Sequence, residues 1–194
     1  MTESSASAFE RLAAEGYNRI PVTLETFADL DTPLSIYLKL ANGPYTYLLE
    51  SVQGGERFGR YSFIGLSCPT RLVVNARQVL LLNGNRIAER ADDTDPLDFI
   101  GAPLPGLPRF CGGLVGCFGY DTVRYVEPRL AHAHKTDPLG VPDIILLLSE
   151  EIAVVDNLSG KLTLVVYAEP GVPGAYHKAR TRLKSLLEQL RRPV

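Results

Sequence analysis

The stretch QVLLLNGNR at residues 78–86 decides the fold class, because it places an Asn-Gly pair directly after an apolar run of β-forming residues. Asn83-Gly84 in this setting is the strongest short-range signal for a β-hairpin, since a type I′ turn needs positive φ at both central residues. Three upstream segments have the same character and are separated by Gly, Pro or Asn: residues 45–50, 61–66 and 71–76. Together these segments predict an antiparallel meander.

Capped helices flank the predicted meander. Asp31-Thr32-Pro33 supplies a side-chain cap and a first-turn proline, and apolar residues then recur at helical spacing until Asn42-Gly43-Pro44. Shorter helical patterns cover residues 4–15 and 94–100. A stronger one begins at Pro173 and has a single apolar stripe, made of Ala179, Leu183, Leu186, Leu187 and Leu190.

Two strong strand patterns precede the last helix. They cover residues 144–155, with a possible break at Ser149, and residues 161–168, and we expect the two to pair. The glycine-rich stretch 112–120 predicts a further strand that another backbone approaches closely. A doubly wound parallel fold needs strict alternation of strand and helix, which the meander breaks. The sequence therefore predicts an α+β fold with an antiparallel sheet.

The composition is that of an ordinary globular chain. Twenty basic and 22 acidic residues among 194 give a net charge of −2, and the mean hydropathy is +0.03. This balance argues against a basic nucleic-acid scaffold and against a polybasic membrane binder. A chain of this length buries roughly 70% of its unfolded surface, which predicts one sizeable core.

The cysteines and the apolar runs indicate where in the cell the protein is expected. No apolar run approaches the ~20 residues of a membrane helix, and the N-terminus lacks the pattern of a signal peptide. Cys68, Cys111 and Cys117 form an odd set without a CxxC pair, which argues against a disulfide framework or a zinc ribbon. We expect a cytoplasmic protein that does not bind membranes.

Two pairs of neighbouring residues are candidates for a chemical site. His132 and His134 would share one face of an extended segment, but no acidic or cysteine ligands flank them, so a solvated loop is favoured over a metal site. Glu150 and Glu151 could form a general acid/base pair, but neighbours in a strand point to opposite faces. We therefore assign no metal ligand and no catalytic residue in this chain.

The C-terminal helix carries a basic side. Its cations face only one acid, Glu188: Lys178, Arg180, Arg182, Lys184, Arg191 and Arg192. A nucleic-acid site would add stacking aromatics, and Tyr176 is the only aromatic close by. A solvated face, or one that meets an acidic partner domain, is favoured over nucleic-acid binding.

One stretch combines an acid, a hydroxyl and a guanidinium. Residues 45–51 form a strand that ends at Glu50 and Ser51, and residues 58–65 re-enter the sheet after a turn, with Arg60 near their start. Antiparallel pairing would bring the three side chains to one end of the sheet. Glu50 could accept from the α-ammonium of a free amino acid, Ser51 could hydrogen-bond to it, and Arg60 could help to hold its carboxylate. The same spacing also fits a salt bridge at the rim of the sheet.

These residues resemble a known family. The sequence LLES at residues 48–51, followed by GGERFGRYSFIG at residues 54–65, closely resembles the N-terminal domain of anthranilate synthase component I. Residues 17–22, 112–121 and 142–156 resemble, in the same order, its opening strand, its glycine-rich strand and its closing hairpin. The resemblance covers about residues 17–168 and implies a two-sheet, sandwich-like antiparallel core flanked by helices.

The resemblance also implies a function. Members of this family convert chorismate and an amino donor into anthranilate and pyruvate in tryptophan biosynthesis, and L-tryptophan inhibits them by feedback at a pocket in the N-terminal domain. Carried over by position, that pocket implies Leu49, Glu50 and Ser51, and at a nearby basic position Arg60. The implied partners are L-tryptophan, the catalytic C-terminal half of component I and the glutamine amidotransferase, component II.

The family's chorismate- and Mg²⁺-binding residues belong to a longer C-terminal domain, so none is carried over and the chain alone is expected to be inactive. We expect residues 1–16 to be an N-terminal segment, residues 17–170 the family domain, and residues 171–194 a basic helix that leads toward the catalytic domain.

Three alternatives remain open at this stage. The chain could be the N-terminal part of an aminodeoxychorismate synthase, in which a related pocket holds a tryptophan that does not exchange. It could be a stand-alone amino-acid-binding or interaction module. Least favoured is an unrelated enzyme that uses Glu150 and Glu151.

Overall fold

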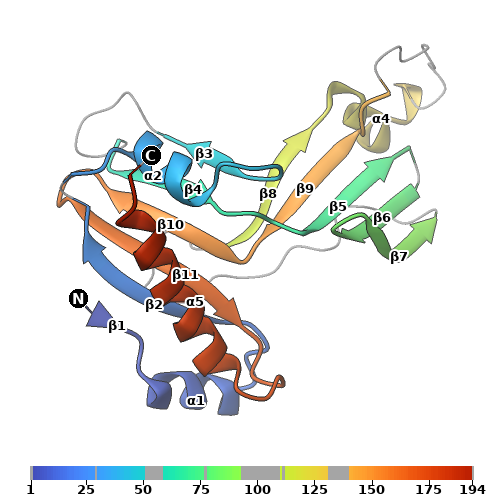
Figure 1. Ribbon diagram of the computed structural model, residues 1–194. Coiled ribbons are helices and arrows are strands. Elements are labelled where there is room, and N and C mark those ends of the chain that lie inside the picture. The colour runs from blue at the N-terminus through green and yellow to red at the C-terminus, as the bar shows by residue number, and fades with distance from the viewer. Residues whose placement is uncertain are drawn as a thin grey trace. The chain divides into compact units, whose positions relative to one another are not determined.

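Two antiparallel sheets form the framework of the protein in a computed structural model, which describes residues 2–28, 30–50, 59–76, 78–92, 110, 112–130 and 140–193 (Figure 1). The first sheet has the order β1–β2–β11–β10–β4–β3, formed by Thr2–Glu3, Ile20–Phe27, Lys161–Ala168, Glu151–Asp156, Tyr61–Gly65 and Tyr47–Leu49. The second has the order β7–β6–β5–β9–β8, formed by Arg86–Asp92, Gln78–Asn83, Thr70–Asn75, Ile144–Ser149 and Gly113–Phe118. The helices are α1 (Ala6–Ala14), α2 (Pro33–Leu40), α4 (Val123–Val126) and α5 (Ala175–Leu190), with 3₁₀ turns at Tyr120–Thr122 and Pro128–Leu130. The predicted α+β class with antiparallel sheets is confirmed.

The chain divides into two compact units. Unit 1 comprises residues 1–68, 108–112 and 149–194, and unit 2 comprises residues 69–107 and 113–148. The first sheet belongs to unit 1 with α1, α2 and α5, and the second sheet belongs to unit 2 with α4. The buried apolar residues form separate clusters within these units, where the chain length alone predicts one core.

The predicted meander is confirmed only in part, because its segments are divided between the two sheets: residues 45–50 and 61–66 form the β3–β4 pair of the first sheet, and β4 does not pair with β5. Its second half is an antiparallel meander in unit 2, with a correction at its turn. β5 pairs with β6, and β6 pairs with β7. Asn83 pairs with Arg86, so the two turn residues are Gly84 and Asn85, one position later than predicted. Only Gly84, at φ 58°, has positive φ, so the type I′ prediction is wrong. A glycine at the first turn position is typical of a type II′ turn, which suits a hairpin equally well.

The segment predicted as one strand over residues 144–155 is broken after Ser149, where the sequence analysis allowed a break. β9 pairs with β5 of the second sheet, whereas β10 pairs with β4 and β11 of the first. The predicted pairing with residues 161–168 therefore holds for β10 alone. Glu150 lies between the two strands, at the point where the chain passes from one sheet to the other.

Unit 1 buries apolar residues on both faces of its sheet. Because side chains alternate along a strand, Ala153 and Val155 of β10 face the helices, whereas Ile152 and Val154 face the other side. α5 lies along β11 and β2 (Figure 1) and buries Leu183 and Leu186 completely against this sheet. The opposite face is covered by aromatic side chains, namely Tyr61, Phe63, Phe110 and Tyr167.

The helix signals in the sequence are confirmed where the structure describes them. α2 begins after Thr32, whose hydroxyl accepts from the Ser35 backbone N–H at 3.1 Å while the Ser35 hydroxyl accepts from the Thr32 N–H at 3.0 Å. α1 and α5 lie within the predicted ranges. The predicted helix at residues 94–100 and the histidines His132 and His134 lie outside the described residues. Among the helices described, none is long and apolar enough to cross a bilayer.

Candidate functional site

The β3–β4 pair brings two of the predicted site residues to one end of the unit 1 sheet. Leu49, the last residue of β3, pairs with Phe63, and Tyr47 pairs with Gly65, so the strands are antiparallel and Glu50 follows β3 at the end where Arg60 precedes β4. This is the arrangement that the sequence analysis predicts for Glu50 and Arg60. Ser51 lies outside the described residues.

Leu49 and Glu50 are open to solvent. Leu49 is 46% exposed, and Glu50 is exposed directly after it. No hydrogen bond or ion pair joins Glu50 to another residue in the described part of the chain. An exposed carboxylate beside an exposed leucine can receive a ligand that carries both a cation and an apolar group.

Arg60 is already engaged by a carboxylate of the sheet. Its Nε and Nη2 donate to the two carboxylate oxygens of Asp156, at 3.1 and 2.7 Å in the shortest contacts, which is a forked charge-assisted pair. The guanidinium also lies 5.0 Å from the centre of the Tyr61 ring. A ligand carboxylate at Arg60 would therefore contact the remaining nitrogen, Nη1, or replace Asp156.

Asp156 also fixes the turn between β10 and β11. Its Oδ1 accepts from the backbone N–H groups of Leu158 at 3.1 Å and Ser159 at 3.4 Å. The hydrogen bonds from Arg60 and from this turn outweigh partial burial and lower the pKa of Asp156 to about 2. Asp156 was not singled out from the sequence as a site residue, because its closeness to Arg60 depends on β4 pairing with β10.

Asn157 ties the same turn to the start of β4. Its backbone N–H donates to the Arg60 carbonyl at 2.8 Å, and its Nδ2 donates to the buried hydroxyl of Ser62 at 3.0 Å. The segment that carries Arg60 is thus held by both the backbone and the side chain of the β10–β11 turn. Hydrogen bonds therefore fix the backbone at this end of the sheet, and a binding site requires such a fixed framework.

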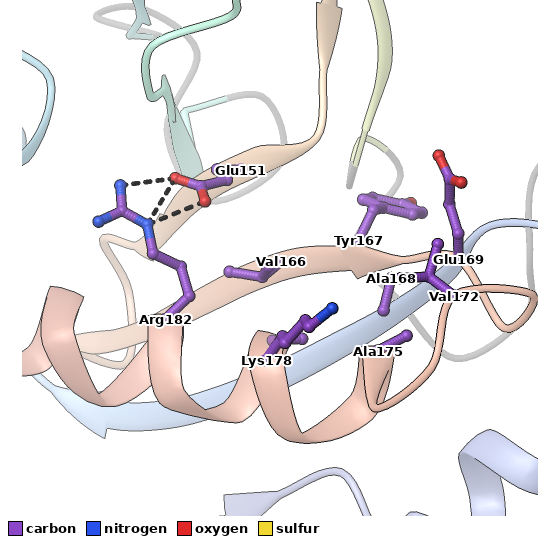
Figure 2. Close-up of a pocket in the computed structure, with 10 residues that line it drawn as sticks. Glu151, Val166, Tyr167, Ala168, Glu169, Val172, Ala175, Lys178 and Arg182 are labelled. Atoms are coloured by element: carbon purple, nitrogen blue, oxygen red, sulfur yellow. Dashed lines mark hydrogen bonds and ion pairs between the residues drawn. The ribbon is translucent and has the colours of Figure 1, made fainter.

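A groove between α5 and β11 is the second candidate place (Figure 2). It has a volume of about 280 Å³ and an apolar floor that includes Val166, Ala168, Ala175 and Ala179. Arg182 reaches from α5 to Glu151 with contacts of 2.8 and 2.9 Å, which raises the pKa of Arg182. Arg182 and Glu151 satisfy each other, and the other two charged residues of the lining, Lys178 and Glu169, also have opposite signs, so the lining as a whole carries no net charge.

The two adjacent acids considered as a catalytic pair have separate partners. Glu151 pairs with Arg182, whereas Glu150 pairs with Arg19, whose Nη2 also contacts Glu169 at 2.8 Å. Each carboxylate is thus part of an ion pair that joins elements of unit 1. This gives both acids a structural role and leaves the acid/base hypothesis without support.

The sequence was compared with known proteins and solved structures. No family model matches it. Anthranilate synthase component 1 of Pseudomonas aeruginosa is 56% identical over 96% of this chain, and that of Neisseria meningitidis is 55% identical over 96%. Anthranilate synthase component 1 of Acetivibrio thermocellus is 34% identical over 93%. The chain spans about two fifths of the length of these relatives, between 38% and 40%.

A solved structure supports the fold. The crystal structure of anthranilate synthase component I from Streptococcus pneumoniae matches 87% of this chain and 37% of its own, with a TM-score of 0.52 at 23% identity. At that identity the match speaks for the fold alone, and it agrees with the two antiparallel sheets described above. Identity above 50% along nearly the whole chain relates this protein to the N-terminal region of anthranilate synthase component I.

Proposed function

We propose that this chain is the N-terminal, regulatory part of an anthranilate synthase component I and that it binds L-tryptophan as a feedback inhibitor. The whole enzyme would convert chorismate and ammonia, or the amide nitrogen of glutamine, into anthranilate and pyruvate in tryptophan biosynthesis. The names of the relatives support anthranilate synthase over aminodeoxychorismate synthase. The odd number of cysteines supports a cytoplasmic location.

The observation that carries the regulatory proposal is the convergence of Glu50 and Arg60 at one end of β3 and β4. In the proposed complex the Glu50 carboxylate accepts from the α-ammonium, and Arg60 binds the α-carboxylate. The exposed Leu49 contacts the indole ring, and the Ser51 hydroxyl adds a hydrogen bond. Inhibition then reflects different affinities of the ligand for two arrangements of the enzyme.

The absence of tryptophan from the sequence gives a direct binding test. Excitation at the red edge of the indole band reports added L-tryptophan, and its fluorescence anisotropy should rise with saturation as the chain is titrated in. Ser51→Phe should abolish the rise by filling the pocket. Ser7→Phe, at an exposed serine of α1, is the matched control and should bind normally. A wild-type chain that gives no saturable rise would contradict the proposed site.

We further propose that the chain makes no anthranilate on its own and that Mg²⁺ and chorismate bind elsewhere in the enzyme. This proposal assigns no residue of the chain to Mg²⁺. In this proposal residues 17–170 form the regulatory domain, and residues 171–194 lead toward the catalytic half. Anthranilate fluorescence from purified chain, chorismate, Mg²⁺ and ammonia would overturn the proposal.

The glutamine amidotransferase, component II, is the proposed partner of the assembled enzyme. Retention of that subunit by this chain alone would show that the chain also serves as its docking module. A requirement for the catalytic half would confine this chain to regulation.

A further inference from the structure

β3 is a short edge strand that carries the first residue of the proposed site. It pairs with β4 through three residues, and its other edge pairs with no strand in the described ranges. Three ladder pairs hold a strand weakly, since isolated short strands are at best marginally stable. Side chains must therefore supply much of what keeps Glu50 in one place.

Tyr47 supplies side-chain contacts of two kinds, one through its ring and one through its hydroxyl. Its ring covers Gly65, its cross-strand partner, so closely that a β-carbon on Gly65 would meet the ring at 1.9 Å. Its hydroxyl lies 2.6 Å from the Oγ of Ser149, which is 1% exposed. Burial raises the pKa of Tyr47 to about 12, although the hydrogen bond to Ser149 acts in the opposite direction. Tyr47 is thus a neutral, anchored side chain at physiological pH.

Cys68 completes a buried cluster around this hydroxyl. Its side chain is 1% exposed, and its thiol donates to the Leu66 carbonyl at 3.1 Å. Burial raises the pKa of Cys68, and a hydrogen bond with Ser149 lowers it in part. The Cys68 backbone N–H donates to the Tyr45 carbonyl at 3.1 Å, two residues before Tyr47. We call Tyr47, Cys68 and Ser149 the Tyr47 cluster.

The cluster joins three segments that the sequence keeps apart. Tyr47 belongs to β3, Cys68 follows β4, and Ser149 directly precedes the Glu150–Glu151 step into β10. Cys68 and Ser149 are also boundary residues of unit 1: Cys68 ends its first segment, and Ser149 begins its last. β3, with the residues directly before it, is therefore bonded to the segment that follows β4 and to the segment that precedes β10.

We propose that Tyr47 is a positioning residue for the tryptophan site, and that the site exists only while the Tyr47 cluster is closed. This inference rests on the proposed binding of L-tryptophan beside Glu50. The closed cluster fixes β3, and β3 presents Glu50 three residues beyond Tyr47. By linkage, a ligand that binds only the closed state must also hold the cluster closed.

The first test compares affinities for L-tryptophan by the anisotropy titration. Tyr47→Phe keeps the ring and removes the hydroxyl, so that β3 holds Glu50 less firmly even while the cluster is closed, and we expect the Kd to rise about fivefold, as for the loss of one buried hydrogen bond. Ser149→Ala should have a similar effect, and the double variant should be no weaker than either single variant. Tyr176→Phe is the matched control, because it removes a hydroxyl that donates to the Ser4 carbonyl at 2.7 Å elsewhere in unit 1. It should lower the melting temperature about as much as Tyr47→Phe does and leave the Kd unchanged.

The second test uses the Cys68 thiol as a reporter of cluster opening. In a Cys111→Ser, Cys117→Ser background, Ellman's reagent can react only with Cys68, which must open first because it is buried. L-tryptophan at 20 times its Kd should slow this reaction about twentyfold, since it binds the closed state alone. Tyr47→Phe should speed the reaction in the absence of ligand.

The outcomes separate the two proposals. A wild-type chain that does not bind L-tryptophan overturns the proposed site and this inference with it. A chain that binds L-tryptophan supports the site, and wild-type affinity in Tyr47→Phe and Ser149→Ala then overturns the inference alone. A Cys68 labelling rate that saturating L-tryptophan does not change has the same consequence.

Discussion

Each end of β10 carries a carboxylate that forms a forked ion pair with an arginine, but the two ion pairs stabilise different parts of unit 1. Glu151, the first residue of β10, receives a forked arginine from α5, and Asp156, its last residue, receives a forked arginine from the segment before β4. The distances are nearly equal, since the shortest contact is 2.8 Å at Glu151 and 2.7 Å at Asp156. The surroundings are different: Arg182 stands on a helix whose apolar face is buried, whereas Arg60 stands beside the turn that Asp156 itself organises.

This difference shows that the geometry of an ion pair does not set its importance. At Glu151 apolar contacts already attach α5 to the sheet. The ion pair therefore adds little to the free energy of unfolding. At Asp156 one carboxylate holds both an arginine and two backbone N–H groups, so its loss loosens a turn as well as an ion pair. The Asp156 end is the one next to the proposed ligand site.

The largest effect should come from breaking the apolar attachment of α5. Leu183 is completely buried between α5 and the unit 1 sheet, and Leu183→Ala should lower the free energy of unfolding by about 3 kcal/mol through lost burial and a residual cavity. Urea unfolding followed by circular dichroism measures this change. Leu187→Ala, one position off the fully buried stripe, should cost clearly less. Equal losses in the two variants would show that α5 is not held by this stripe.

The next effect concerns the Asp156 end and depends on pH. The folded-state pKa of Asp156 is about 2, below its ordinary value of 3.8, so its contribution is complete above pH 3.8 and is lost as the pH falls toward 2. Asp156→Asn should therefore cost about 1 kcal/mol at pH 7, after allowance for solvent screening, and less as the pH drops below 4. Urea midpoints at pH 7, 5, 4 and 3 measure the trend.

Asp92→Asn provides the control for this pH series. Asp92 pairs with Arg90 on the exposed β7, with a shortest contact of 3.2 Å. Within the described residues it does not bind the backbone of a turn as Asp156 does. Asp92 also accepts from Gln78 at 3.3 Å, and these hydrogen bonds lower its pKa, so Asp92→Asn should shift the urea midpoint in the same direction as Asp156→Asn. Because this pair is exposed on both sides, its shift should be clearly smaller than that of Asp156→Asn at pH 7. A pH-independent cost for Asp156→Asn would show that the turn needs the shape of the side chain and not its charge.

Local signals in the sequence account for much of this fold. Thr32 and Ser35 cap α2 where the sequence places its start, and Asn83-Gly84 marks a real hairpin. The turn lies one residue later than predicted because strand pairing sets the register, and that register shifts between Leu81 and Leu82. Such a shift in register depends on both paired strands, so the turn residues alone do not predict it.

The sequence predicts only the part of the candidate site that two consecutive strands bring together. Glu50 and Arg60 flank one antiparallel pair, and their convergence follows from that pairing. The Arg60–Asp156 pair spans 96 residues of sequence, and the Tyr47–Ser149 hydrogen bond spans 102. The first follows from the pairing of β10 with β4, and the second involves the last residue of β9. A continuous apolar run over residues 144–155 does not show which strands its two halves will pair with.

The smallest effect on stability should come from the Glu151 end of β10. Arg182→Met keeps the apolar stem that covers the groove and removes only the charge, so the free energy of unfolding should fall by less than about 1 kcal/mol. Glu151→Gln should behave alike, and 0.5 M salt should narrow the gap between wild type and both variants. Affinity for L-tryptophan should be unchanged in Arg182→Met, since Arg182 belongs neither to the end of β3 nor to the Tyr47 cluster. A loss of tryptophan binding in Arg182→Met would mean that the groove beside α5, and not the Asp156 end of β10, communicates with the ligand.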